Sequence, residues 1–77
     1  MTKTFIKDKF RKWLLHDSFI RNVLKDANGC TLLTVTNWVI NNSPKLTQKD
    51  NLKIISDYYE VKEDDLIIEE KINQHIL

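Results

Sequence analysis

The sequence predicts an all-α protein, a compact bundle of about five short helices. Three observations support this fold class. Apolar residues recur at helical spacing, as in Ile6, Phe10, Trp13 and Leu14. The chain contains one Gly and one Pro, too few for the turns of a sheet with many strands. No stretch shows the alternation of apolar and polar residues that a half-buried strand requires.

The length of 77 residues allows a single domain. We expect residues 1–68 to form this domain and residues 69–77 to form a C-terminal tail. Cys30 is the only cysteine and cannot form an intramolecular disulfide, which suits a reducing cytoplasm. The apolar runs are too short to span a membrane or to form the core of a signal peptide. His16, Cys30 and His75 are far apart in sequence, so we predict no metal site. We also predict a cytoplasmic protein without a cofactor.

The charged residues are distributed unevenly, although the net charge is only +1. Residues 1–25 contain seven Lys and Arg against two Asp, whereas residues 51–77 contain three Lys against seven Asp and Glu. This asymmetry suits a protein that presents one basic face to a polyanion. Two ordinary solvated helices of opposite charge explain the same distribution equally well.

The first two helices are predicted over residues 4–16 and from residue 18 to the Asn28-Gly29 pair. The first should carry Lys3, Lys7 and Arg11 together on a face away from its apolar side. Asp17 or Ser18 can cap the start of the second helix. Gly29 can end it, because glycine readily adopts the left-handed conformation. The apolar positions of the second helix are Phe19, Ile20, Val23, Leu24 and Ala27.

The third helix should begin after Thr31, whose side chain can cap it. Val35, Trp38 and Val39 then share its inward face. The helix should stop at residues 41–44, where Asn41 tolerates a left-handed backbone and Pro44 disfavours a helical Ser43. Two short helices joined by a glycine turn are typical of a helix-turn-helix.

Two more helices complete the predicted bundle. Thr47 and Asp50 have the spacing of a capping box at the start of the fourth helix. The inward positions of this helix are Leu52, Ile55 and Tyr59. The acidic residues 63–65 favour the first turn of a fifth helix, where they face the positive end of its dipole. The apolar positions of the fifth helix are Leu66, Ile67 and Ile68.

The segment Gly29–Trp38 resembles the turn and recognition helix of the phage repressor and Cro-like (XRE-type) DNA-binding domains. That family usually shows Gly, an apolar residue, Ser or Thr, two variable residues and then Thr-Val-Ser-x-Trp. The segment from Leu52 to Leu66 has the spacing of the family's fourth helix and of the entry to its fifth. The resemblance covers residues 5–68 and implies a lambda-repressor-like fold.

Three positions depart from the family pattern. Lys25 follows Leu24 where the family commonly has Ala, so either the second helix is shifted or Lys25 extends outward. Asn41 stands where the family often has Gly. The connection from Trp38 to Leu52 is about two residues longer than usual, so the loop at residues 43–47 should bulge.

The resemblance implies a sequence-specific transcriptional regulator that binds double-stranded DNA as a homodimer, with its third helix in the major groove. It places four residues opposite base edges: Leu32, Leu33, Thr36 and Asn37. It places five residues near phosphates: Thr31, Asn42, Ser43, Lys45 and Lys49. The Asn37 amide can pair with adenine, and the leucines can contact thymine methyl groups, so we expect an A/T-rich operator. The candidate dimer contacts are Ile67, Ile68, Ile72 and Ile76.

A second interpretation remains open, because the third helix contains no Lys or Arg. Leu32 is expected to join the core beside Val35, whereas Leu33 is expected to be exposed. An exposed leucine here equally fits a fold used for protein binding, such as an antirepressor or assembly partner. Trp13, Trp38 and Cys30 are expected in the core. The sequence suggests no catalytic arrangement, so we predict neither an enzyme nor a small-molecule substrate.

Overall fold

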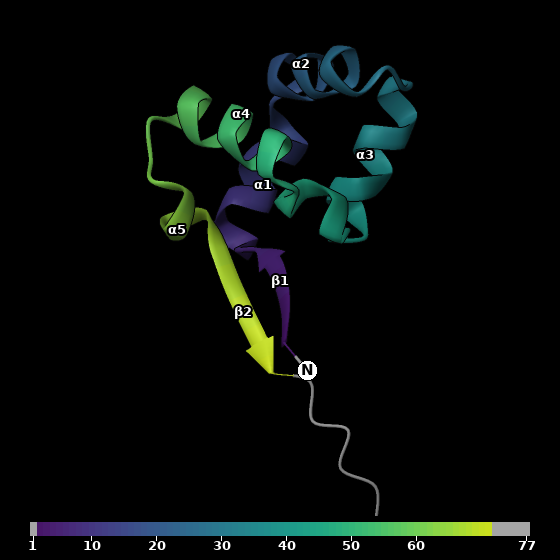
Figure 1. The fold of residues 1–77 in the computed structure, drawn as a ribbon. Helices are drawn as coiled ribbons and strands as arrows, with labels where there is room; N and C mark the ends of the chain where they lie inside the picture. The colour runs from purple at the N-terminus through teal and green to yellow at the C-terminus, as the bar shows by residue number, and fades with distance from the viewer. Residues whose placement is uncertain (1, 72–77) are drawn as a thin grey trace, which may run out of the picture.

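The computed structural model describes residues 2–71. Its helices pack into one body, and its first and last elements form a short ribbon that extends from that body (Figure 1). The predicted bundle of short helices is confirmed, with a small two-stranded sheet in addition. The elements are β1 (Thr2–Ile6), α1 (Asp8–His16), α2 (Ser18–Asn28), α3 (Leu32–Ile40), the 3-10 helix η1 (Pro44–Thr47), α4 (Lys49–Tyr59), α5 (Glu63–Leu66) and β2 (Ile67–Lys71).

The two strands correct the prediction at both ends of the domain. Residues 4–6 belong to β1 rather than to the first helix, and Ile67 and Ile68 belong to β2 rather than to the fifth helix. The strands are antiparallel, with Ile6 opposite Ile67 and Phe5 opposite Ile68. Periodicity within a short segment cannot reveal this pairing, because the partners lie about sixty residues apart in the chain. β2 also runs through residue 68, where the domain was expected to end.

The predicted helix caps are largely confirmed. Asp17 Oδ1 accepts hydrogen bonds from the backbone N–H groups of Phe19 and Ile20 at 3.1 and 3.4 Å. Gly29 ends α2 with φ of 61°, in the left-handed region. Thr31 caps α3 by accepting from the Thr34 N–H at 3.2 Å. These side chains satisfy backbone groups that the helix itself leaves unpaired.

The loop between α3 and α4 contains the expected bulge but differs from the prediction in two details. Asn42, not Asn41, takes the left-handed conformation, with φ of 51°. The expected bulge is the 3-10 helix η1, which Ser43 caps by accepting from the Lys45 N–H at 3.2 Å. Thr47 makes no capping box, because it lies in η1 and not directly before α4; its hydroxyl donates to the carbonyl oxygens of Pro44 and Thr4. The residue before α4 is Gln48, which makes no side-chain cap.

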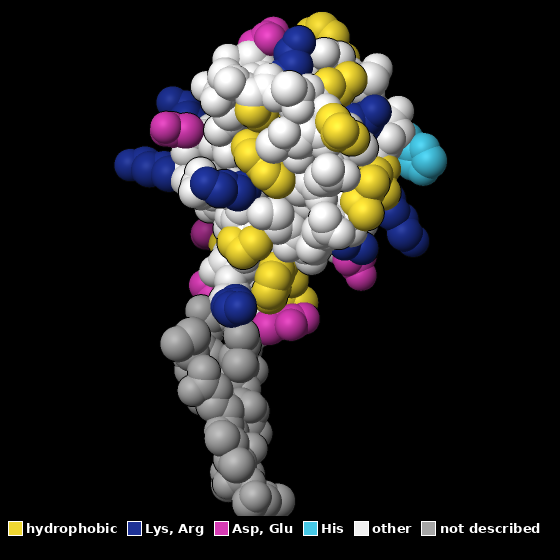
Figure 2. Space-filling view, turned by 90° about the vertical axis from the view of Figure 1, so that its right-hand side faces the viewer, with side chains coloured by type: hydrophobic (Ala, Val, Ile, Leu, Met, Phe, Trp, Pro, Cys, Tyr) yellow, Lys and Arg dark blue, Asp and Glu magenta, His cyan; other side chains and the backbone are white. Residues whose placement is uncertain are grey.

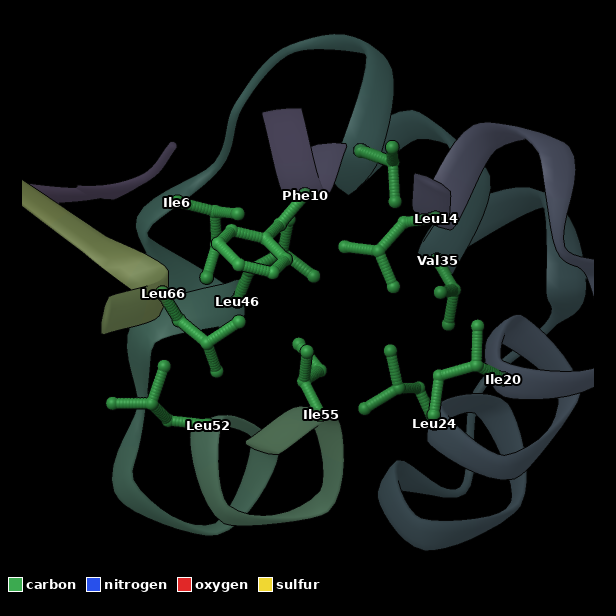
Figure 3. Close-up of a cluster of buried hydrophobic side chains, with 11 residues drawn as sticks. Ile6, Phe10, Leu14, Ile20, Leu24, Val35, Leu46, Leu52, Ile55 and Leu66 are labelled. Carbon is green, nitrogen blue, oxygen red and sulfur yellow. The ribbon is translucent and has the colours of Figure 1, made fainter. Parts of the chain in front are cut away.

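Every helix and the 3-10 turn contribute to one hydrophobic core (Figure 3). Its buried members are Ile6, Phe10, Leu14, Ile20, Leu24, Val35, Val39, Leu46, Leu52, Ile55 and Leu66. Cys30 and Trp38 are partly buried and pack against it, close to expectation. Trp13 was expected in the core but is 41% exposed, and Phe19, an apolar position of the second helix, is 64% exposed. Helical spacing marks an apolar side of a helix but not how far the neighbouring helices extend over it.

An amide pair, of which Asn51 is buried and Asn28 is exposed, ties three elements together. The Asn28 Nδ2 donates to Asn51 Oδ1 at 2.8 Å, and the Asn51 Nδ2 donates to the Lys45 carbonyl at 2.9 Å. Asn51 is buried on α4, so its amide needs these partners. The pair joins the end of α2 to α4 and η1, and so it braces both ends of the segment that carries α3.

Within residues 2–71, no helix is long and apolar enough to cross a membrane.

Candidate nucleic-acid interface

The connection between α2 and α3 is short and closed by backbone hydrogen bonds. The Gly29 N–H donates to the Asp26 carbonyl, and the Cys30 N–H donates to the Lys25 carbonyl at 3.2 Å. Gly29 can take its positive φ without the steric cost that a Cβ brings. Three residues therefore suffice to turn the chain from α2 into α3.

The inward face of α3 anchors the helix. Val35 and Val39 are fully buried, and Trp38 packs partly buried against the same core. These positions follow the i, i+3, i+4 spacing predicted for the inward face, which is confirmed. Because α3 contacts α1, α2 and η1, its orientation is set by packing on several sides.

The outward face of α3 is uncharged, with two large apolar side chains. Leu33 is 69% exposed and Ile40 is 55% exposed, with the exposed Asn37 between them. Spacing of four and then three residues places these side chains on one stripe of the helix. No residue of α3 carries a charge. Figure 2, which looks onto the α3 side of the molecule, shows hydrophobic and uncharged surface there, with Lys and Arg side chains nearer the margins.

The residues expected opposite base edges are not equally accessible. Leu33 is exposed, as predicted, and Asn37 is exposed beside it. Thr36 is half-buried. The expectation that Leu32 joins the core is wrong, since its side chain is 36% exposed at the first turn of α3. Leu32 is the first residue of α3, and the neighbouring elements leave its side chain partly uncovered.

The residues expected near phosphates lie around the two ends of α3. Thr31 is exposed at the start of the helix, where its hydroxyl lies 2.9 Å from that of Thr34. Lys45 and Lys49 are exposed on η1 and at the start of α4. Ser43 is half-buried and uses its oxygen to cap η1, which leaves its hydroxyl proton free to donate. The Asn42 Oδ1 is buried and finds no partner within residues 2–71, so this amide turns inward.

The basic residues of the first third do not form one face. Lys3 lies on β1, apart from the helix that carries Arg11, so the predicted stripe with Lys7 is wrong. Arg11 donates to the Ile40 carbonyl at 3.4 Å and pairs with Asp8 at 3.4 Å. It therefore places one positive charge at the C-terminal end of α3, where the helix dipole favours a cation.

Two other basic side chains support the helices themselves. Arg21 donates to the carbonyl oxygens of Leu14 and Leu15, at the end of α1. Lys25 is partly exposed and pairs with Asp26 at 3.3 Å, which fits the expectation that it extends outward. Arg21 and Lys25 therefore have partners within the fold.

Sequence reasoning did not identify Ile40 as part of the exposed face of α3. The signal was present, because Ile40 lies seven residues after Leu33 and three after Asn37, on the same side of a helix. The exposed aromatic surface around Trp13 and Phe19 was also missed. Its residues come from three helices, and no local pattern in the chain joins them.

Comparisons with protein-family models, with curated proteins and with solved structures found no match to this chain. Among residues 2–71, no group of three or more His, Cys, Asp or Glu side chains is arranged to hold a metal ion.

Proposed function

We propose that this protein is a sequence-specific DNA-binding transcriptional regulator of the repressor/Cro type. It acts as a homodimer that occupies an operator and places α3 in the major groove. One observation carries the proposal. The short turn at Gly29 presents α3 on the outside of the body, anchored by Val35 and Val39 and exposed along Leu33 and Asn37. In this proposal α2, the three-residue turn and α3 form a helix-turn-helix, a motif in which a short turn joins two helices.

Base readout in this proposal depends on Asn37. Its exposed amide can donate to N7 and accept from N6 of adenine, a contact worth about 1–3 kcal/mol of discrimination. Leu33 offers only apolar contact, so the 5-methyl group of thymine is its best base partner. The preferred operator is therefore rich in A·T pairs at the positions that α3 faces.

Phosphate contacts in this proposal come from the two ends of α3. Its N-terminal N–H groups and the Thr31 hydroxyl lie at one end, and Lys45 and Lys49 lie on the segments that follow the other. Few cations are available, so each protomer should neutralise only about two to four phosphates. Affinity then depends on salt with a modest slope, and two protomers are needed for tight binding.

The test is a salt series of binding to a fluorescent mixed-sequence duplex of about 20 base pairs, followed by selection of preferred sequences. We expect affinity to fall as salt rises. Asn37→Ala should remove the preference for adenine at one position. Lys62→Gln, a change on the exposed residue before α5, is the matched surface control and should bind as the parent does. Absence of binding at low salt by a folded protein would refute the proposal.

A second candidate function is protein binding through the same helix. The observation that favours it is the apolar stripe of Leu33 and Ile40 on a helix without charge. Protein interfaces are depleted of charge at their centre, and α3 has this character. An antirepressor or assembly partner would use α3 in this way. A protein with this function would show no salt-dependent affinity for duplex DNA, so the same titration distinguishes the two candidate functions.

A further inference from the structure

The ribbon of β1 and β2 has one side that no other described element covers. β1 contacts both β2 and η1, and the Thr47 hydroxyl of η1 donates to the Thr4 carbonyl at 3.4 Å. Figure 1 shows β1 along one side of β2 and no described element along the other. We call the backbone of Ile67–Lys71, on the side away from β1, the β2 edge.

The register of the two strands shows which backbone groups lie on the β2 edge. In an antiparallel pair, residues that exchange hydrogen bonds alternate with residues whose N–H and C=O groups point outward. The Lys7 N–H donates to the Leu66 carbonyl at 2.8 Å, so these two residues occupy a hydrogen-bonded position of the ladder. Ile67 is the next residue of β2, so its N–H and C=O groups point away from β1, and those of Glu69 do the same two residues later.

An independent contact supports this assignment. Thr4 lies opposite Glu69, and its carbonyl points away from β2 towards the Thr47 hydroxyl. Two opposed residues both turn their backbone groups inward or both turn them outward, so the groups of Glu69 point outward as well. No hydrogen bond to another described element satisfies the backbone groups of Ile67 or Glu69. The β2 edge therefore offers donors and acceptors with the spacing of an unpaired strand.

An edge of this kind recognises an extended backbone. Main-chain hydrogen bonds supply the affinity for an added strand, and the side chains beside it supply the specificity. A sheet of two strands is only marginally stable by itself, so a third strand stabilises it. The ribbon extends from the helical body (Figure 1), and a strand added along β2 need not touch α3.

The charges beside the β2 edge favour a partner strand with a cation. Glu69 and Glu70 are exposed on β2, and residues 63–65 of the preceding α5 are three further exposed acidic residues. Lys3 lies opposite Glu70, but the residue opposite Glu69 is the uncharged Thr4. Among the side chains that the structure describes, Glu69 forms no ion pair. The other cations belong to the two ends of the ribbon: Lys7, Lys62 and Lys71.

The same charges disfavour a second copy of β2 as the added strand. Glu69 is the central residue of Ile67–Lys71, so full antiparallel overlap of two copies places Glu69 opposite Glu69. Like charges directly opposite each other destabilise a pair of strands. A strand from a different protein, with Lys or Arg at this position, avoids the repulsion and gains an opposite-charge pair.

We propose that the β2 edge binds an extended segment of another protein as a third, antiparallel strand. This segment carries Lys or Arg opposite Glu69 and apolar residues opposite Ile67 and Ile68. The inference goes beyond the proposed function, because the contact contains no residue of α3 and needs no DNA. The dimer contact expected from the sequence involves the same strand through Ile67 and Ile68, whereas Ile72 and Ile76 lie outside the described residues.

The test is a titration of the ¹⁵N-labelled full chain with the synthetic peptide acetyl-Thr-Thr-Lys-Val-Val-Thr-amide, followed by two-dimensional NMR up to about 2 mM peptide. The largest amide shifts should fall on Ile67 and Glu69, whose N–H groups gain partners, and the amides of α3 should not move. A peptide with Glu in place of Lys should bind about three- to tenfold more weakly, because it places like charges opposite each other.

Two methylated peptides separate strand addition from contact through side chains alone. N-methylation of the Lys and the second Val removes the N–H groups that face Glu69 and Ile67, and it should abolish binding. N-methylation of the second Thr and the first Val removes N–H groups that point away from β2, so this matched control should still bind. Equal losses with both peptides would overturn the proposal.

A charge reversal on the protein supplies a further test. Glu69→Lys should weaken binding of the Lys peptide about three- to tenfold and strengthen binding of the Glu peptide. Asp57→Lys makes the same change of charge at an exposed position of α4 and should alter neither. Absence of shifts at Ile67 and Glu69 at every peptide concentration would overturn the proposal. Shifts of these amides that grow with protein concentration, without peptide, would identify a second copy as the occupant and would also overturn it.

Discussion

Two leucine-to-alanine substitutions remove the same atoms from opposite environments. Leu46 is fully buried on η1, whereas Leu33 is 69% exposed on α3. Leu46→Ala leaves a cavity among the core side chains and should cost about 2–5 kcal/mol of unfolding free energy. Leu33→Ala leaves no cavity and should change it by less than about 0.5 kcal/mol.

The magnitude matters because the total stability is small. A helical domain of this size has about 3–5 kcal/mol of stability in all. A loss of about 3 kcal/mol lowers Tm by roughly 12–24 °C and leaves a substantial unfolded fraction at 37 °C. The change should also loosen α3, because η1 contacts both β1 and α3.

Thermal and urea unfolding followed by circular dichroism at 222 nm measure both variants against the parent. The urea midpoint should fall for Leu46→Ala with little change in slope, since the unfolded state exposes nearly the same surface. If Leu33→Ala destabilised the protein as much as Leu46→Ala, the assignment of Leu46 to the core and Leu33 to the surface would be refuted.

Three further predictions follow from single residues. Leu33→Lys adds a cation to the face proposed to contact DNA. Affinity for duplex DNA at low salt should rise about three- to tenfold, and affinity should fall more steeply as the salt concentration rises. An unchanged titration would argue against DNA contact by α3. Gly29→Ala should lower the free energy of unfolding by about 1–2 kcal/mol, because φ of 61° is strained for a residue with a Cβ although no atom crowds that Cβ. Gly29→Asn should lower it by less, since asparagine tolerates this conformation better. Equal urea midpoints for the parent and both variants would contradict this prediction. Burial raises the folded-state pKa of Tyr59 from 10.0 to about 12, so its contribution to stability is present below pH 10 and is lost as pH rises towards 12. Tyr59→Phe should flatten this alkaline decline in the urea midpoint, and an identical pH profile for the variant would contradict the assignment.

The two candidate functions make different demands on the same helix. DNA binding needs Asn37 and the cations near the ends of α3, whereas protein binding needs Leu33 and Ile40. All of these side chains lie on or beside α3, so the position of a substitution does not distinguish the two functions. The type of side chain that is removed, polar or apolar, does distinguish them. Asn37→Ala should impair the first function more, and Ile40→Ser should impair the second more.

Part of the candidate site could be predicted from the sequence because it depends on neighbouring residues. The inward positions of Val35 and Val39, the left-handed Gly29 and the cap at Thr31 all follow from helix geometry and backbone conformation. Exposure of Leu33 follows from the same geometry, since it points nearly opposite to Val35. Exposure of Leu32 does not, because it depends on how far other elements extend over the first turn of α3.

The sequence by itself determined where most helices begin and end and which side of each helix is apolar, because caps, glycine conformation and helical periodicity act within a few residues. Only the tertiary structure decided that the two ends of the domain pair as strands. It also decided that Leu46 enters the core and that Trp13, Phe19 and Tyr58 meet on one surface. Those outcomes depend on which segments, distant in sequence, pack against one another, and this is determined by the packing of the whole chain.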